Sequence, residues 1–223
     1  MRELSRAALA VVAFLAVPTA CQAASLDDQC EDPDDSHAQQ IVAACTALLA
    51  QPENNGPTAS GMFENLASAL LDNRAQAYIT LREYELAVKD LDQAIGYGLR
   101  ETDPASADIF QIRCMARAQW GRQLDQAIAD CDKAEALGNN GLMTYIWRAL
   151  AKYRAGQWQG ALDDSNKADA AALADNRGPE AWFLRGLAEK RLGQTAQGNA
   201  DIARAEERAS DVAAYFAGFG VEP

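Results

Sequence analysis

The chain repeats one pattern of charged and small residues four times, and this repetition restricts the fold more than any other feature. In each copy an arginine is followed three positions later by an alanine, and an aspartate is followed four positions later by another alanine. Successive arginines are 39, 35 and 37 residues apart, a period that predicts a solenoid of stacked units. The arginine–aspartate pairs are Arg74 and Asp90, Arg113 and Asp130, Arg148 and Asp164, and Arg185 and Asp201.

Each copy has the features of two antiparallel helices joined by a short turn. Small and apolar residues recur at three- and four-residue spacing, which is typical of amphipathic helices. A glycine stands in the middle of three copies, at Gly121, Gly156 and Gly193, whereas "LREY" (81–84) takes that place in the first. Clusters of proline, glycine and asparagine separate the copies. The sequence therefore predicts an all-α fold of four helical hairpins, preceded by a partial repeat.

These repeats resemble those of the tetratricopeptide repeat (TPR) family. The segments "NRAQAYITLREYELAVKDLDQAI" (73–95) and "WRALAKYRAGQWQGALDDSNKA" (147–168) carry the likeness, with two alanines seven positions apart on the second helix. The arginine–aspartate variant and the early segment "IVAACTALL" (41–49) are similar to a group of exported bacterial members. The resemblance covers roughly residues 36–207. It implies a right-handed superhelix with a concave surface formed by the first helices, and a protein- or peptide-binding scaffold whose partner it does not identify.

The N-terminus has the features of a secretory signal peptide. Arg2 and Arg6 precede an apolar run at 7–17, which is too short to cross a bilayer and is followed by small residues. We place the cleavage after Ala23, with Ala24 as the alternative. The predicted domains are a signal peptide (1–23), an acidic segment with a partial repeat (24–67), four hairpins (68–206), and a capping helix with a tail (207–223).

We expect an exported protein, periplasmic or secreted, without a transmembrane span in the mature chain. A lipoprotein acylated at Cys21 is the competing interpretation, and it would make the protein a lipid-anchored subunit of an outer-membrane assembly. Lipoprotein signals usually carry leucine or a similar residue three positions before the cysteine, where this chain has Pro18. The sequence therefore favours the soluble form.

Export favours disulfides among the four remaining cysteines, Cys30, Cys45, Cys114 and Cys131. Residues equidistant from the turn of a hairpin lie at the same height, which pairs Cys114 with Cys131, and the similar spacing pairs Cys30 with Cys45. Buried free thiols are the alternative, and a zinc site lacks both a CxxC pair and a second histidine beside His37.

The same geometry predicts a salt bridge between the arginine and the aspartate of each hairpin. Solvated surface charges are one alternative, and pairing between neighbouring repeats is another. In either case these residues are predicted to belong to the scaffold and not to a catalytic site.

Composition and motifs argue against several classes of function. The chain has 32 acidic and 20 basic residues and a net charge of −12, which does not suit a nucleic-acid surface. The motifs GxSxG, GxxxxGK and HExxH do not occur, so we expect no enzyme, although a repeat scaffold can host an unrecognised site. No cofactor or metal is expected, because the acidic run before Ser36 lacks the glycine and glutamate of a calcium loop. Ser36 and Gln39 fit a capping box at a helix start.

The resemblance places a stripe of first-helix residues on the concave side, and this stripe becomes more apolar along the chain. An aromatic cluster flanked by arginine and lysine suits an extended or helical peptide with acidic ends. The alternatives are that these side chains form core between repeats, or that the C-terminal helix covers them. The predicted peptide-binding residues are Ile112, Met115, Ile146, Trp147, Leu150, Tyr153, Arg154, Phe183, Leu187, Lys190 and Arg191.

The C-terminal segment "DVAAYFAGFGVEP" (211–223) is too apolar for a free tail. A solenoid needs a cap on its last unit. We therefore predict a capping helix at 207–217, with Tyr215 and Phe216 packed on the fourth hairpin and with Gly218 and Gly220 ending the helix.

Overall fold

Eleven α-helices make up the described part of this computed structural model, which comprises residues 25–51, 54, 62–97, 104–172 and 178–223. The predicted signal peptide and Cys21 lie outside the described residues. Within them, no helix is long and apolar enough to cross a membrane. The helices are α1 (Leu26–Cys30), α2 (Ala38–Leu49), α3 (Met62–Thr80), α4 (Tyr84–Gly96), α5 (Ala107–Trp120), α6 (Leu124–Ala136), α7 (Leu142–Arg154), α8 (Trp158–Ala172), α9 (Pro179–Arg191), α10 (Thr195–Arg208) and α11 (Val212–Ala217).

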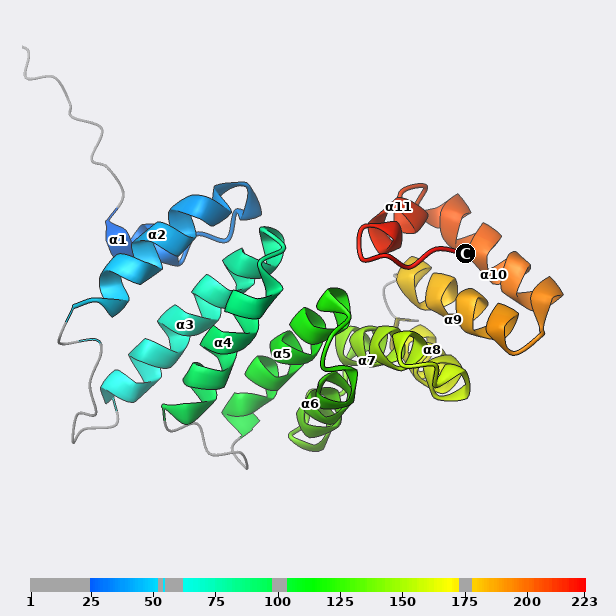
Figure 1. Ribbon diagram of the computed structural model, residues 1–223, viewed down its shortest axis with the longest axis horizontal. Coiled ribbons are helices and arrows are strands. Elements are labelled where there is room, and N and C mark those ends of the chain that lie inside the picture. Colours follow the sequence, from blue (N-terminus) through cyan, green and yellow to red (C-terminus); the bar gives the residue numbers. More distant parts are fainter. Residues whose placement is uncertain (1–24, 52–53, 55–61, 98–103, 173–177) are drawn as a thin grey trace, which may run out of the picture.

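The helices stack as consecutive antiparallel pairs along a curve, shown in Figure 1. Each of the pairs α3–α4, α5–α6, α7–α8 and α9–α10 is one copy of the sequence repeat. The first helices pack on one another in series, α3 on α5, α5 on α7 and α7 on α9. At one end of the stack α2 packs on α3, and at the other end α11 packs on α9 and α10. The predicted all-α solenoid of helical hairpins is therefore confirmed.

Small residues allow the two helices of each hairpin to approach closely. The alanines that recur on the second helices, such as Ala87 and Ala161, are fully buried. In the last hairpin Gly198 takes the place of such an alanine, and a Cβ built on it would lie 2.5 Å from the carbonyl oxygen of Gly186. The glycine thus replaces alanine where the backbones of α9 and α10 come closest, because a methyl group there would overlap the neighbouring main chain.

The turn inside each of the four hairpins uses a residue with positive φ, eight positions after the repeat arginine. Gly121, Gly156 and Gly193 hold this place with φ of 72°, 75° and 85°. In the first hairpin the same place belongs to Arg82, with φ of 61°. A left-handed conformation costs an L-residue about 1–2 kcal/mol, whereas glycine adopts it freely. The first hairpin therefore carries a backbone cost at this place that glycine avoids in the other three, although Gln123, two residues after Gly121, also has a positive φ of 53°.

Two disulfides, both with the predicted pairing, are present in the structure. Cys30–Cys45 joins α1 to α2, and Cys114–Cys131 joins α5 to α6. All four cysteines are buried in the two hydrophobic clusters that form the core. The chain separations of 15 and 17 residues correspond to a stabilisation of about 3 kcal/mol for each bond by loop entropy.

The start of α2 differs from the expectation at Ser36. Ser36 lies inside a short 3-10 turn, Asp35–His37, and the Asp34 side chain accepts a hydrogen bond from its main-chain N–H at 2.9 Å. The helix itself begins after His37, which makes no side-chain cap, so the predicted capping box with Gln39 is wrong. The His37 ring Nδ1 instead lies 2.8 Å from Asp32 Oδ2, and this hydrogen bond raises the pKa of the imidazole.

Candidate binding site along the first helices

The repeat arginine of each hairpin forms a bidentate salt bridge with the aspartate of the same hairpin. Arg74 donates from Nε and Nη2 to the two carboxylate oxygens of Asp90, at 2.7 and 2.8 Å. Arg148 binds Asp164 in the same way at 2.9 and 2.8 Å, with both side chains almost fully buried. The bond with Asp90 is the main cause that raises the pKa of Arg74. The remaining two pairs, Arg113 with Asp130 and Arg185 with Asp201, have the same bidentate arrangement.

The third nitrogen of each arginine binds the preceding structural unit. Arg113 Nη1 donates to Asp92 of α4 at 2.7 Å, and Arg148 Nη1 donates to Asp132 of α6 at 2.7 Å. In the first hairpin, Arg74 Nη1 donates to Thr46 of α2 at 3.0 Å. One guanidinium therefore closes its own hairpin and also links it to the element before it. Pairing within a hairpin and pairing between repeats, which the sequence left as alternatives, occur together.

The sequence also contains a signal for the acceptor that each of the later arginines finds on the preceding hairpin. The first three repeats carry an acid or amide two residues after the aspartate, at Asp92, Asp132 and Asn166, and each accepts a hydrogen bond from the next arginine. In the fourth repeat this place is Ala203, and no further arginine repeat follows. The polar residue thus occurs where a following arginine needs an acceptor.

The apolar stripe of the third and fourth hairpins lies under the C-terminal segment and is not an open surface. Phe183 is fully buried, and its ring stacks on Phe216 of α11 with centroids 5.1 Å apart. Val221, beyond α11, is also buried in this cluster. Both alternative predictions for this stripe therefore apply: its side chains form core between the repeats, and the C-terminal helix covers part of it. The predicted peptide-binding residues that it buries here are Ile146, Trp147, Leu150, Phe183 and Leu187.

Arg154 binds the protein itself in the structure. Its Nη1 donates to the carbonyl oxygens of Ala118 and Gln119 at 3.1 and 2.9 Å, at the C-terminal end of α5. The last carbonyls of a helix lack intrahelical donors and carry partial negative charge, so a guanidinium is well placed there. Gly121 permits this approach, since a Cβ on it would lie 1.9 Å from Arg154 Nη2. Sequence reasoning assigned Arg154 to a peptide and missed this contact between repeats.

The remaining predicted residues divide between the two ends of the stack. Tyr153, Lys190 and Arg191 line a small depression with Pro223, and Arg191 Nε donates to the Tyr153 hydroxyl at 3.1 Å. Ile112 packs partly buried against the N-terminal core cluster. Met115 lies elsewhere, in the wall of a larger depression between α3, α5 and α11.

This larger depression, called the first depression below, has a volume of about 370 Å³. The first helices α3 and α5 form one wall, and α11 and the residues after it form the opposite wall. Amide, hydroxyl, charged and apolar groups all line it, so it can hydrogen-bond a main chain and also hold an apolar side chain. Its lining residues are Asp35, Gln76, Ile79, Thr80, Arg82, Tyr84, Met115, Gln119, Tyr215 and Phe219.

A second depression of about 280 Å³ adjoins the first and shares Gln76 and Asp35 with it. Asn73 adds another amide to its wall, and Asp32 adds a carboxylate. Together the two depressions follow the α3 face from the N-terminal segment to α11.

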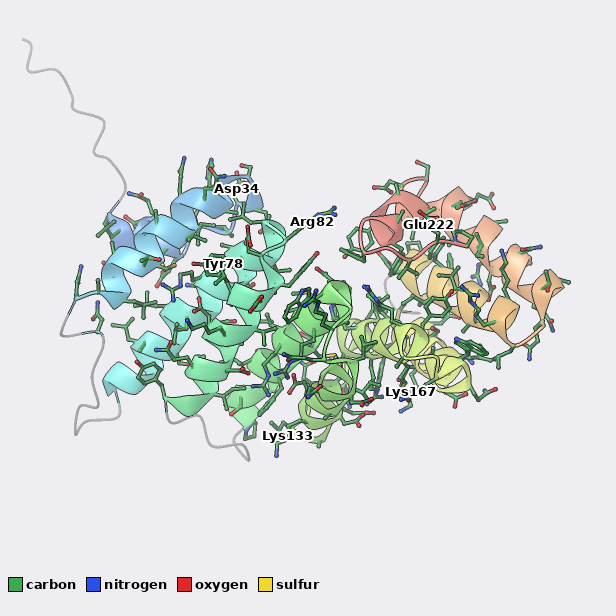
Figure 2. All side chains as sticks on the ribbon, viewed as in Figure 1. Asp34, Tyr78, Arg82, Lys133, Lys167 and Glu222 are labelled. Carbon is green, nitrogen blue, oxygen red and sulfur yellow. A yellow bond between two sulfur atoms is a disulfide. The ribbon has the colours of Figure 1, made fainter. Side chains whose placement is uncertain are left out.

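Arg82 joins the two walls of the first depression. Its Nη1 donates to the carbonyl oxygen of Gly218 at 2.8 Å, across 136 residues of sequence. Figure 2 shows the Arg82 side chain projecting from the α3–α4 turn toward the C-terminal end of the stack. Because the bond is exposed and its acceptor is neutral, its net contribution to stability is about 1 kcal/mol.

The stacked hairpins, the small-residue crossings and the capping helix together define a TPR-fold protein. Among solved structures, the chain is similar to MamA, with a TM-score of 0.58 and 17% identity over 79% of this chain and 91% of that chain. It is also similar to TTC0263, a thermophilic TPR protein of Thermus thermophilus, with a TM-score of 0.58 and 16% identity over 82% and 91% of the two chains. A tetratricopeptide repeat protein from Parabacteroides merdae matches with a TM-score of 0.55 and 20% identity over 76% and 58%.

No family model matches the sequence, and no curated protein matches it. At these identities the similarity to solved structures concerns the fold. The likeness to TPR structures therefore supports the all-α solenoid of helical hairpins.

Proposed function

We propose that the protein is a non-catalytic scaffold that binds an extended segment of another protein in the first depression. The observation that carries this proposal is the composition of that depression, which is lined by the amides of Gln76 and Gln119 and by the apolar side chains of Ile79 and Met115. An extended segment needs partners for its main-chain N–H and C=O groups and a pocket for alternate side chains. The depression offers both, whereas the apolar stripe of the later hairpins is covered by α11.

The pairing of the repeat aspartates gives little support to a catalytic role for these carboxylates. Each repeat aspartate is bound by its arginine, which holds the carboxylate in a fixed structural pair. Among the described residues, no group of three or more histidine, cysteine or acidic side chains is arranged to hold a metal ion. We therefore assign recognition, and not catalysis, to this fold.

We further propose that the protein works in an oxidising compartment of the cell envelope or outside the cell. Two disulfides support this location, because such bonds persist mainly in exported proteins. Protein purified from the envelope should have lost residues 1–23 by mass, and reduction of the two disulfides should add the mass of four hydrogen atoms. A mature chain that retains these residues, or that gains no mass on reduction, would contradict export.

A displayed library of random peptides tests the binding proposal. We expect selected peptides to bind the purified protein with a dissociation constant that Gln76→Ala raises about tenfold, since each lost hydrogen bond is worth about 1 kcal/mol and the pocket edge is disturbed as well. Fluorescence polarisation of a labelled peptide measures this change. Met115→Lys should weaken the same peptides.

Matched controls separate binding from folding. Gln159→Ala removes an exposed amide that bonds Asp163 four residues away, as Gln76 bonds Asp72. Met143→Lys changes an exposed methionine that lies outside the first depression. Both controls should bind within twofold of the wild type. Peptides that bind equally well to all four variants would show that the first depression is not the site.

A further inference from the structure

We propose that the C-terminal segment is a clasp that closes the first depression at Arg82 and opens there to admit a partner. The role of the clasp in admitting a partner rests on the proposed function, whereas the closing contact is a property of this chain alone. Arg82 belongs to the first hairpin, and Gly218 follows α11, which packs on the fourth. The contact therefore spans the whole set of hairpins.

The two ends of the clasp differ in strength. On the fourth hairpin, α11 is held by the buried Phe216, whose ring stacks on Phe183, and by the buried Val221. On the first hairpin, the hydrogen bond from Arg82 that holds the segment is exposed to solvent. Opening therefore occurs at Arg82, while α11 stays attached to α9 and moves with it.

The position of Arg82 in its turn is a second, independent observation. The corresponding residue in the other three hairpins is glycine, and Arg82 adopts the same left-handed backbone with φ of 61°. An arginine at a place suited to glycine disfavours its own turn. Residues in such conformations often serve a function that offsets the strain. The long-range bond to Gly218 is the contact that this arginine makes and that a glycine could not.

The place of the clasp links it to access. Arg82 lines the first depression from one side, and Tyr215 and Phe219 line it from the other. Tyr215 and Phe219 contact each other edge to face with centroids 4.9 Å apart. Separating Arg82 from Gly218 moves these two rings away from α3 and widens the entrance.

Distance measurement between spin labels tests the clasp in the full mature chain without any ligand. Labels at Glu83→Cys and Glu222→Cys report the separation of the two sides, because both residues are exposed and the native cysteines are in disulfides. We expect one narrow distance distribution for the parent protein. Arg82→Gly should give a broader distribution centred at a longer distance, although it relieves the turn.

Two further variants complete the test. Gly218→Val keeps Arg82 but places a side chain where its guanidinium lies, since a Cβ on Gly218 would lie 2.9 Å from Arg82 Nη2 and 3.1 Å from the Tyr215 carbonyl oxygen, and it should displace the guanidinium and broaden the distribution in the same way. Arg122→Gly, an exposed arginine in the turn of the next hairpin, is the control and should leave the distances unchanged. A narrow, unshifted distribution in both Arg82→Gly and Gly218→Val, or equal broadening in Arg122→Gly, would overturn the clasp.

A binding experiment distinguishes failure of the clasp from failure of the proposed function. For a peptide selected from the library, Arg82→Gly should raise the association rate constant several-fold relative to the parent protein. Broader distances with an unchanged association rate would contradict the role of the clasp in access. A protein that yields no binding peptide would contradict the proposed function, and the distance data would still decide whether the clasp exists.

Discussion

Charged side chains in this protein differ in how completely their hydrogen-bonding atoms are paired. Each repeat arginine donates hydrogen bonds to at least three acceptor atoms, so its guanidinium is well paired. Asp72 of α3 has the opposite situation, because its Oδ1 is buried and accepts no hydrogen bond, while Oδ2 accepts one from Gln76. Burial is the main cause that raises the pKa of Asp72 to about 6. The charged form of this residue is therefore unfavourable in the folded state.

This raised pKa predicts a specific dependence of stability on pH. A folded-state pKa above the unfolded value of 3.8 means that the folded protein binds the proton more tightly. The stabilisation is fully present below about pH 4 and is lost as the pH rises through about 6. Asp72→Asn is neutral throughout, so at neutral pH it should be more stable than the wild type by on the order of 1–2 kcal/mol.

Urea unfolding at a series of pH values measures the difference between Asp72→Asn and the wild type. Asp163→Asn on α8, an exposed aspartate with a similar amide neighbour, provides the control for the substitution itself. A difference for Asp72→Asn that is the same in acid and at neutral pH would show that the carboxylate is not buried in solution.

At the scale of the helices, the guanidinium groups link each hairpin to the element before it. Arg148 is 3% exposed, and Asp164, to which it binds, is 2% exposed, whereas Asp132 on the preceding hairpin is 60% exposed. Breaking a buried pair leaves an uncompensated charge, whereas losing an exposed partner costs little. The link within a hairpin should therefore contribute more than the link between hairpins.

Two substitutions compare these contributions, because one removes both links of Arg148 and the other removes a link between hairpins alone. Arg148→Ala removes the bonds to Asp164, Asp132 and Glu135 and should lower the free energy of unfolding by about 3 kcal/mol, since among the described residues the buried Asp164 then keeps the contact from Lys152. Asp132→Ala should lower it by less than about 1 kcal/mol. Both values come from urea unfolding followed by circular dichroism. Equal losses for the two variants would mean that the bidentate pair holds no special place in the repeat.

The sequence allowed the hairpins, the salt bridges and both disulfide pairings to be predicted, because these features join residues close to one another across a turn. The symmetry of Cys114 and Cys131 about the turn is a local property that spacing reports directly. It did not reveal whether the apolar stripe was covered, since Phe183 meets Phe216 only after the chain has turned back at α11. Nor could spacing predict the bond from Arg82 to Gly218, which has no counterpart in the other repeats.

The candidate site proposed from the structure differs from the one predicted from the sequence, because spacing does not show where the C-terminal segment packs. Apolar character increases toward the later hairpins, and sequence reasoning followed that trend to Trp147 and Phe183. In the structure the chain's own C-terminal segment uses this apolar surface. The first depression lies at the more polar hairpins, where Gln76 and Met115 are in its wall together with Tyr215 of α11. A depression of similar volume, about 370 Å³, remains at the later hairpins and is lined by the predicted residues Tyr153, Arg154 and Arg191.

The whole molecule is thus a curved stack whose last segment returns toward its first hairpin. The first helices line one side of the curve, and the second helices carry the repeat aspartates that fix them. This division assigns binding to the first-helix side and structural support to the second helices. α11 serves both parts, because it caps α9 and forms one wall of the first depression.

Hydrogen exchange with a selected peptide bound tests this division most directly. We expect slower exchange of main-chain amides in the second half of α3, the second half of α5 and in α11, where the walls of the first depression lie. Amides of α4, α6 and α8 should exchange as they do without peptide, except at Tyr84. Protection that falls mainly on these second helices, or outside the α3, α5 and α11 walls, would contradict the proposal that the first-helix side binds the partner.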